Sequence, residues 1–234
     1  VSATDHASHP RLGEDAGTIA GLGPIGVPLA NEPAGDVEVM IDFSLPQGTR
    51  SALAWCEARG WPLVIGTTGL SDDDQQTIDA AAQSIAVLYA SNFSQVVNVL
   101  HELLAKAAPM LGNDYDVEVL EAHHRFKRDA PSGTAISLAK TICDATSRNF
   151  DQDVVFTRHG DDVPRRQGEI TMQTLRIGDH PGEHTVYFAA LGERLELKHV
   201  STSRDSYVHG ALNSAKWLAG KPAGRYTMRD VLGL

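Results

Sequence analysis

Short apolar runs alternate with stretches of helical periodicity in the first part of the chain. The runs are rich in Val and Ile and predict strands at residues 37–43, 62–66 and 85–90. Apolar positions recur at helical spacing at residues 48–60, from Ser71 onward, and at about 97–110. Such an alternation of short apolar strands and helices indicates a parallel sheet that is covered on both faces.

Longer strand-like runs dominate the second part of the chain. A short strand at residues 117–120 and a helix at about 133–146 come first. The long runs follow at residues 170–177, 184–190 and 195–201. Gly-Asp and Gly-Glu turns separate these runs, which is typical of a mostly antiparallel sheet. The last expected helices are residues 206–219 and 228–232.

These patterns predict an α/β fold with two domains. We expect residues 1–94 and 205–234 to form a Rossmann-like domain with a parallel sheet. We expect residues 95–204 to form an inserted α+β domain with a mixed, mostly antiparallel sheet. A chain of 234 residues suits two domains of modest size.

The composition is that of an ordinary globular protein, with 42% hydrophobic residues and a net charge of −10. A diffuse acidic field repels nucleic acid and anionic membranes, so neither is expected as a partner. No apolar run approaches the roughly 18 residues of a membrane span, and we expect a cytoplasmic protein. The two cysteines, Cys56 and Cys143, lie in apolar helix-like stretches and are expected to be buried thiols.

Residues 121–135 contain the densest set of candidate chemistry. Two imidazoles, His123 and His124, and several cations including Lys127 lie just before a helix start at 132–134. Backbone N–H groups at a helix start bind carboxylate or phosphate groups. Lys127 and His124 are placed to hold a second anionic group, and imidazole is suited to proton transfer near neutral pH. The segment therefore predicts a pocket for a small dianion with a proton donor at hand.

Other interpretations of this segment stay open or are disfavoured. Basic residues in a loop are often only solvated, and adjacent histidines on a strand point in different directions. No metal site is expected, because the segment lacks a His-Glu-x-x-His pattern and a nearby Cys pair. Ser132 lacks the Gly-x-Ser-x-Gly elbow of a serine hydrolase.

The run from His123 to Ala135, His-His-Arg-Phe-Lys-Arg-Asp-Ala-Pro-Ser-Gly-Thr-Ala, resembles the signature of the dihydrodipicolinate reductase family. Further motifs fall in the family's order along nearly the whole chain; they are residues 42–44, 66–69, 92–94, 182–185, 192–196 and 228–232. The resemblance implies that the later strands belong to a sheet that packs into a homotetramer.

The resemblance also implies roles for individual residues. His123 aligns with the family's general acid, and Lys127 with a residue that binds substrate and can deliver the proton. The residues aligned with groups that hold the two substrate carboxylates are His124, Ser132, Gly133 and Thr134. Thr68 aligns with a residue between substrate and nicotinamide. The implied cofactor contacts are Asp5, Phe43, Gly66, Thr68, Ala90, Asn92 and Phe93.

The implied reaction is hydride transfer from NADH or NADPH to a small cyclic dicarboxylate, which reduces 4-hydroxy-tetrahydrodipicolinate to tetrahydrodipicolinate in diaminopimelate and lysine synthesis. Residues 1–94 and 205–234 would bind the dinucleotide, and residues 95–204 would bind substrate and oligomerise. Asp5 would favour NADH, whereas His6 stands where a base often meets the extra phosphate of NADPH.

The family begins with a strand, a Gly-rich loop and a helix, and we expect this unit to be missing, because Val1 aligns near the end of the second strand. The alternative is a truncated, non-catalytic homologue that retains dicarboxylate binding and oligomerisation only. A third possibility is a related nicotinamide enzyme that acts on another small dicarboxylate.

Overall fold

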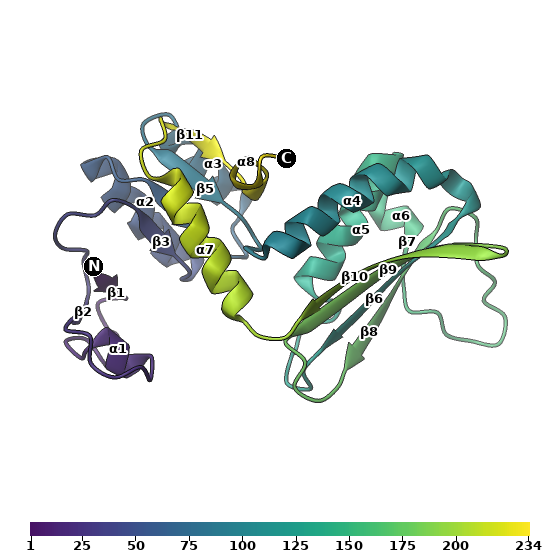
Figure 1. Cartoon of the computed structure of the whole chain (residues 1–234), viewed down its shortest axis with the longest axis horizontal. Coiled ribbons are helices and arrows are strands. Elements are labelled where there is room, and N and C mark those ends of the chain that lie inside the picture. Colours follow the sequence, from purple (N-terminus) through teal and green to yellow (C-terminus); the bar gives the residue numbers. More distant parts are fainter. The chain divides into compact units, whose positions relative to one another are not determined.

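A computed structural model describes all 234 residues, and the chain divides into two compact units. The first unit comprises Val1–Phe93 and His209–Leu234, and the second comprises Ser94–Val208 (Figure 1). The second unit is therefore an insertion in the sequence of the first.

The first unit contains a parallel sheet of four strands in the order β11-β5-β4-β3. The strands are β3 (Met40–Asp42), β4 (Leu63–Ile65), β5 (Ala86–Tyr89) and β11 (Gly224–Tyr226). The helices are α2 (Pro46–Arg59), α3 (Asp72–Ala81), α7 (Asp205–Leu218), which begins in the second unit, and α8 (Met228–Leu232). The predicted parallel sheet is thus confirmed.

Alternate residues of the central strands point to opposite faces of this sheet. Leu63 and Ile65 pack in a cluster with residues of α2 and α3, whereas Val64 packs in a second cluster with residues of α7 and α8. Both faces are therefore covered, which explains why these strands read as continuous apolar runs. Cys56 lies in the first cluster, and burial raises the pKa of its thiol to about 12. Cys143 is also buried and free, so the prediction for both thiols is confirmed.

One expectation for the first unit is wrong in detail, and one strand was not predicted. The strand expected at residues 37–43 is reduced to β3, because this edge strand pairs only with β4, itself three residues long. The sequence did not predict β11, since Gly-Arg-Tyr carries no apolar alternation.

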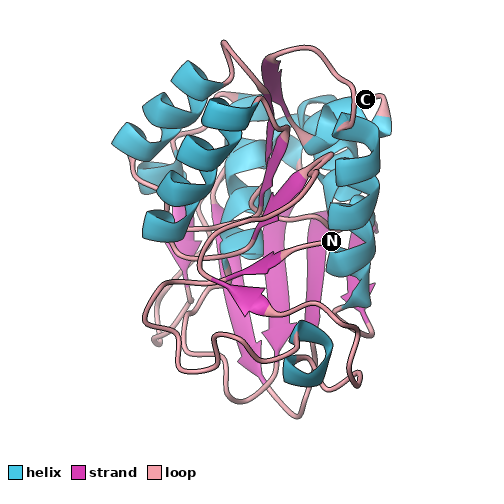
Figure 2. Ribbon diagram, turned by 90° about the vertical axis from the view of Figure 1, so that its left-hand side faces the viewer, coloured by secondary structure: helices cyan, strands magenta, loops and turns pink.

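The residues before β3 form mostly loops with one short helix (Figure 2). β1 (Ala3–Thr4) pairs in parallel with β2 (Leu29–Ala30) in a separate two-stranded sheet. α1 (Ala16–Ile19) is capped by Asp15, whose carboxylate also accepts N–H bonds from residues 25–27. The opening residues were expected at the end of a strand of the parallel sheet, but they pair only with β2.

The second unit contains a mixed sheet in the order β10-β9-β6-β8-β7. The strands are β6 (Asp116–His123), β7 (Val154–Phe156), β8 (Ile170–Arg176), β9 (Gly182–Ala190) and β10 (Glu193–Ser201). β9 is antiparallel to both of its neighbours, whereas β8 is parallel to β6 and β7. The turn after β8 does not join neighbouring strands, because β6 lies between β8 and β9.

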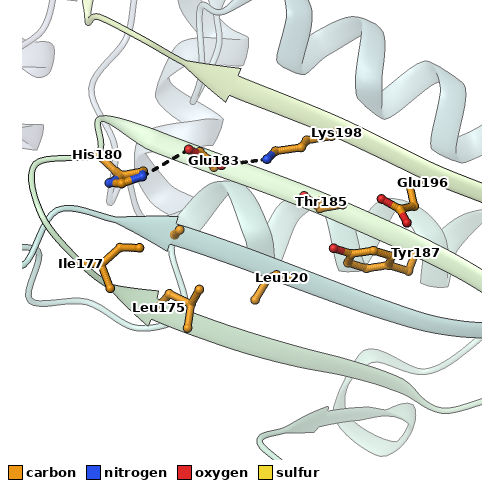
Figure 3. Close-up of a pocket in the computed structure, with 10 residues that line it drawn as sticks. Leu120, Leu175, Ile177, His180, Glu183, Thr185, Tyr187, Glu196 and Lys198 are labelled. Carbon is orange, nitrogen blue, oxygen red and sulfur yellow. Dashed lines mark ion pairs between the residues drawn. The ribbon is translucent and has the colours of Figure 1, made fainter.

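Helices cover one face of this second sheet. α4 (Gln95–Leu111), which runs into the short 3-10 turn η1 (Gly112–Asp114), and α5 (Gly133–Thr146) pack on each other and on the strands, and α6 (Phe150–Asp153) precedes β7 (Figure 1). The opposite face is open and carries a shallow pocket (Figure 3). The apolar side chains of Leu175 and Ile177 line this pocket, and each residue is nearly half exposed. Glu183, which also lines the pocket, forms ion pairs with His180 and Lys198.

β6 is longer than predicted and continues to His123 rather than ending at Leu120. Val117 and Val119 pack in the core under the helices. With a strand period of two, Glu121 and His123 follow them on the same face. A buried polar site therefore continues the hydrophobic core at the carboxyl end of β6.

Candidate active site

Glu121 and His123 form the centre of the site in the second unit. Glu121 is fully buried, and its Oε2 lies 2.5 Å from Nδ1 of His123. Arg176, the register neighbour of His123 on β8, donates to both carboxylate oxygens of Glu121, each at 2.9 Å. The backbone N–H of Ser132 donates to Oε1 at 3.1 Å. The carboxylate thus receives four hydrogen bonds.

Opposing influences act on the pKa of Glu121. Burial raises it, because a charge in a low-dielectric environment is poorly solvated. The hydrogen bonds from His123 and Arg176 and their positive charges outweigh burial and lower the pKa to about 2. Glu121 is therefore an ionised carboxylate at neutral pH.

Two further histidines extend this site across the sheet. His184 on β9 is the register neighbour of both Glu121 on β6 and His199 on β10. Its ring packs edge-on against His123, with centroids 5.2 Å apart, and its Nδ1 lies 3.5 Å from Nδ1 of His199. Burial, together with the charges of His123 and His199, lowers the pKa of His184 to about 3. His184 is therefore neutral at physiological pH.

The start of α5 is joined to these histidines through Ser132. Ser132 is the N-cap of α5: its Oγ accepts the N–H of Ala135 and lies 3.1 Å from Nε2 of His184. Its own N–H is used by Glu121, so this amide does not face a ligand as the sequence suggested. Gly133 is exposed and has no atom within 4 Å of a Cβ position, and Thr134 is half-buried.

The loop between β6 and α5 carries the remaining predicted residues. Lys127 is mostly buried, and its ammonium lies 2.8 Å from Asp129, where it lowers the pKa of that carboxyl. Arg176 donates to the backbone oxygen of Asp129 at 2.5 Å. The backbone N–H of His124 donates to the carbonyl of His180, and its ring lies near Phe126, whereas the ring of His123 contacts Glu121 and His184. The two adjacent histidines therefore point to different surroundings, as predicted.

In the first unit, predicted cofactor residues gather at the carboxyl ends of parallel strands. Phe43, Gly66 and Ala90 each follow the last residue of β3, β4 or β5, and these last residues are register neighbours. A Cβ on Gly66 would lie 2.3 Å from the Phe43 ring, so only glycine permits this approach. The Phe43 ring is 56% exposed and lies 5.4 Å from the buried ring of Phe93, measured between centroids.

The buried carboxylate of Asp42 stabilises the turns at this edge of the sheet. Asp42 accepts hydrogen bonds from Thr49 (2.5 Å) and Thr67 (2.9 Å), and also from the N–H of Ser44 (3.0 Å). It therefore ties the β3–α2 turn to the Gly-Thr-Thr-Gly turn, and Thr68, next in that turn, is exposed.

The other predicted cofactor residues have different surroundings. Asn92, which directly precedes Phe93 in the sequence, is half-buried. Asp5 follows β1 in the separate two-stranded sheet, where its carboxylate lies 3.8 Å from both His6 and His9. The structure thus brings together Phe43, Gly66, Ala90 and Phe93, whereas Asp5 directly follows β1, a strand of another sheet.

Sequence reasoning missed Glu121, Arg176 and His184 as site residues. It also missed Gly182, where a Cβ would lie 2.9 Å from Nε2 of His123. The signal for Glu121 was a charged residue two positions before His123, on the same face of a strand with buried valines. Arg176 and His184 are 55 and 63 positions away from Glu121 in sequence and are joined to it only by the order of the strands. No group of His, Cys, Asp and Glu side chains has the arrangement of a metal site, and no helix has the length and apolarity needed to span a membrane.

Comparisons with known proteins bear on both units. The family model described as the N-terminus of dihydrodipicolinate reductase matches residues 1–93, and the one for its C-terminus matches residues 96–232. A 4-hydroxy-tetrahydrodipicolinate reductase of Hahella chejuensis is 47% identical over 226 residues, 95% of this chain and 85% of the relative. Another, of Syntrophotalea carbinolica, is 43% identical over 237 residues, 100% of this chain and 89% of the relative.

A solved structure has the same fold. The dipicolinate-bound dihydrodipicolinate reductase of Paenisporosarcina sp. TG-14 superposes with a TM-score of 0.73 at 21% identity, covering 97% of this chain and 86% of that one.

Proposed function

The chain belongs to the dihydrodipicolinate reductase family, and we propose on this basis that it reduces 4-hydroxy-tetrahydrodipicolinate to tetrahydrodipicolinate with NADH or NADPH, a step of diaminopimelate and lysine synthesis. Membership makes it an oxidoreductase that uses a nicotinamide dinucleotide. The structural observation that carries the proposal is the buried Glu121–His123 pair beside the start of α5, which joins a proton-transfer group to an anion-binding element.

We assign the proton transfer to His123 and charge complementarity to Lys127. The Nδ1 of His123 is engaged by Glu121, which leaves Nε2 as the nitrogen that gives or takes a proton. Lys127 supplies a cation held in place by Asp129, and His124, Ser132, Gly133 and Thr134 are the proposed carboxylate-binding residues. A small cyclic dicarboxylate is the proposed substrate class, which the dipicolinate in the Paenisporosarcina structure supports.

The residues at the carboxyl edge of the parallel sheet fit a nicotinamide dinucleotide. An exposed aromatic ring packed on a glycine at this edge is a suitable surface for a planar ring, and ligands of open α/β sheets bind there. When bound, the reduced dinucleotide supplies the hydride. Phe43, Gly66, Thr68, Ala90, Asn92 and Phe93 are the proposed contacts, and Asp5 is the proposed contact to the ribose.

We further propose a homotetramer assembled through the open face of the second sheet. Leu175 and Ile177 expose apolar side chains on this face, where no helix covers them (Figure 3). A cytoplasmic location is proposed as well, and two buried free thiols support a reducing compartment.

Calorimetry of NADH and NADPH binding, with and without pyridine-2,6-dicarboxylate, tests the function. The reductase predicts micromolar dinucleotide binding that tightens when the dicarboxylate is present. Dicarboxylate binding without any dinucleotide binding would instead identify a non-catalytic homologue, and binding of neither ligand would refute both assignments.

A further inference from the structure

Glu121 is the charged side chain most completely withdrawn from solvent, with an exposed fraction of 0%. An ionised carboxylate in such a place is strongly destabilising unless its lone pairs are all engaged. All four donors are present: Arg176 and Ser132 N–H at Oε1, and Arg176 and His123 at Oε2. The fold therefore maintains a buried negative charge directly behind the proposed acid.

The donors around Glu121 determine which nitrogen of His123 carries a proton. An ionised carboxylate only accepts hydrogen bonds, so Nδ1 of His123 must donate at 2.5 Å. In the neutral imidazole Nε2 is then the unprotonated nitrogen, and in the cation both nitrogens carry protons. Proton exchange with a ligand is thereby restricted to Nε2.

The same carboxylate aligns three separate segments. It holds His123 at the end of β6, the N-cap of α5 through Ser132 N–H, and β8 through Arg176. Arg176 continues to the backbone of Asp129, whose side chain holds Lys127. A change at Glu121 therefore reaches the proposed acid and the cation together.

We propose that Glu121 is a positioning residue that fixes the Nδ1–H form of His123 and directs Nε2 toward the substrate. The expected effect of Glu121 on turnover rests on the proposed function. Its expected effect on the position of the proton on His123 does not.

The variant E121Q separates positioning from a merely structural role. The Gln oxygen belongs at the Oε1 position, because Ser132 N–H and Arg176 only donate there. The Gln NH2 then faces Nδ1 of His123 and Nη1 of Arg176. Arg176 can only donate and must shift away, whereas the conflict with His123 is relieved when the imidazole proton moves to Nε2. We expect a switch to the Nε2–H form, visible in nitrogen-15 spectra of the imidazole, and a fall in kcat of about 100-fold with a much smaller change in KM.

A matched control lies on the same strand. Glu118 is half-buried and pairs with Arg165, and its side chain points to the opposite face of β6. E118Q should keep the wild-type imidazole spectrum and turnover. An E121Q protein that folds, keeps Nδ1 protonated and turns over at the wild-type rate would overturn the proposal.

The wild-type protein provides a second test in case E121Q fails to fold. Its free form should show His123 protonated at Nδ1, and finding the neutral ring protonated at Nε2 would overturn the positioning role. Loss of the proposed function is distinguishable from this result: a wild-type protein that shows the Nδ1–H form but reduces no dicarboxylate supports positioning and refutes the reductase.

Discussion

Gly182 on β9 lies beside the working nitrogen of His123: a Cβ at position 182 would be 2.9 Å from Nε2. That is hydrogen-bonding distance, so the missing side chain leaves room for a partner of Nε2 where a methyl group would otherwise stand. Gly182 does not have a positive φ angle, and its backbone would accept alanine. Glycine is therefore required at position 182 by the space beside Nε2 of His123 and not by the backbone conformation.

Gly182→Ala should lower kcat/KM by at least about 10-fold, because the methyl group displaces the imidazole or blocks access to Nε2. Steady-state kinetics with 4-hydroxy-tetrahydrodipicolinate measure the effect. Gly224→Ala is the matched control, since its backbone φ is also not positive and its Cβ would meet only ordinary contacts of 3.4 Å or more. Equal activity of the two variants would disprove the assigned role of the space beside Nε2.

Gly66→Ala should weaken dinucleotide binding. The added Cβ would lie 2.3 Å from the Phe43 ring and must displace it from the carboxyl edge of the parallel sheet. We expect at least a 10-fold rise in the NADH dissociation constant, about 1.4 kcal/mol, by calorimetry. Binding of pyridine-2,6-dicarboxylate alone should change much less, because its proposed carboxylate-binding residues lie in the second unit and only Thr68 belongs to the turn that contains Gly66. An unchanged NADH affinity would remove Gly66 and Phe43 from the cofactor site.

His123→Gln and Lys127→Ala should have different kinetic effects. Loss of the proposed acid removes proton transfer, so H123Q should lower kcat by about 100-fold and change KM little. Loss of the Lys127 cation removes both substrate binding and charge stabilisation, so K127A should raise KM and lower kcat. If both variants turn over normally, the proton-transfer site lies elsewhere.

Stability should fall as the pH decreases from about 6.5 toward 3, through His184. The pKa of His184 is lowered to about 3 from a reference of 6.5, so between these values the unfolded chain binds a proton that the folded chain does not. The stability contributed by the neutral ring is thus complete above pH 6.5 and decreases by up to about 1.4 kcal/mol per pH unit below it. Burial also lowers the pKa of His199 and His101, which add to the same slope.

Urea unfolding of wild type and His184→Gln between pH 5 and 7 isolates this contribution. Glu121 does not interfere, because the stability linked to its lowered pKa is lost only between about pH 4.5 and 2. The variant should show the shallower dependence on pH. Identical slopes would mean that His184 is protonated alike in both states.

The open face of the second sheet should be required for the proposed tetramer. Leu175→Glu places a charge on a side chain that is 42% exposed in the isolated chain and lies among apolar neighbours. Light scattering should show a tetramer for wild type and smaller species for the variant. A charge at exposed Leu191, at the β9–β10 turn outside the pocket lining, is the control. A wild-type monomer would contradict the assembly.

Periodicity was sufficient for elements whose packing is local. The helix at residues 133–146 has the predicted bounds, since Ser132 caps it and its apolar positions repeat at helical spacing. β11 could not be predicted, because Gly224–Tyr226 is a strand only through its pairing with β5. β6 was extended beyond Leu120 by pairing on both sides, with β8 and β9, which short-range patterns do not reveal.

The candidate site also contains residues that the sequence alone revealed and residues that only the fold brings together. His123 and Lys127 stand out as residue types in a motif, and the motif was recognisable without the fold. The partners of Glu121 on other elements come from β8 and the start of α5, and His184, which packs on His123, comes from β9. Their meeting depends on the position of β6 between β8 and β9. Ser132 appeared to offer its amide to a ligand, but the fold directs that amide to Glu121.

Oxidation of NADH and NADPH by the purified chain, followed by the loss of reduced-nicotinamide absorbance on addition of 4-hydroxy-tetrahydrodipicolinate, is the most direct test. We predict turnover with at least one of the two dinucleotides and its near loss in His123→Gln. Absence of turnover in a folded protein that binds both a dinucleotide and pyridine-2,6-dicarboxylate would contradict the reductase, and turnover only with another dicarboxylate would contradict the substrate.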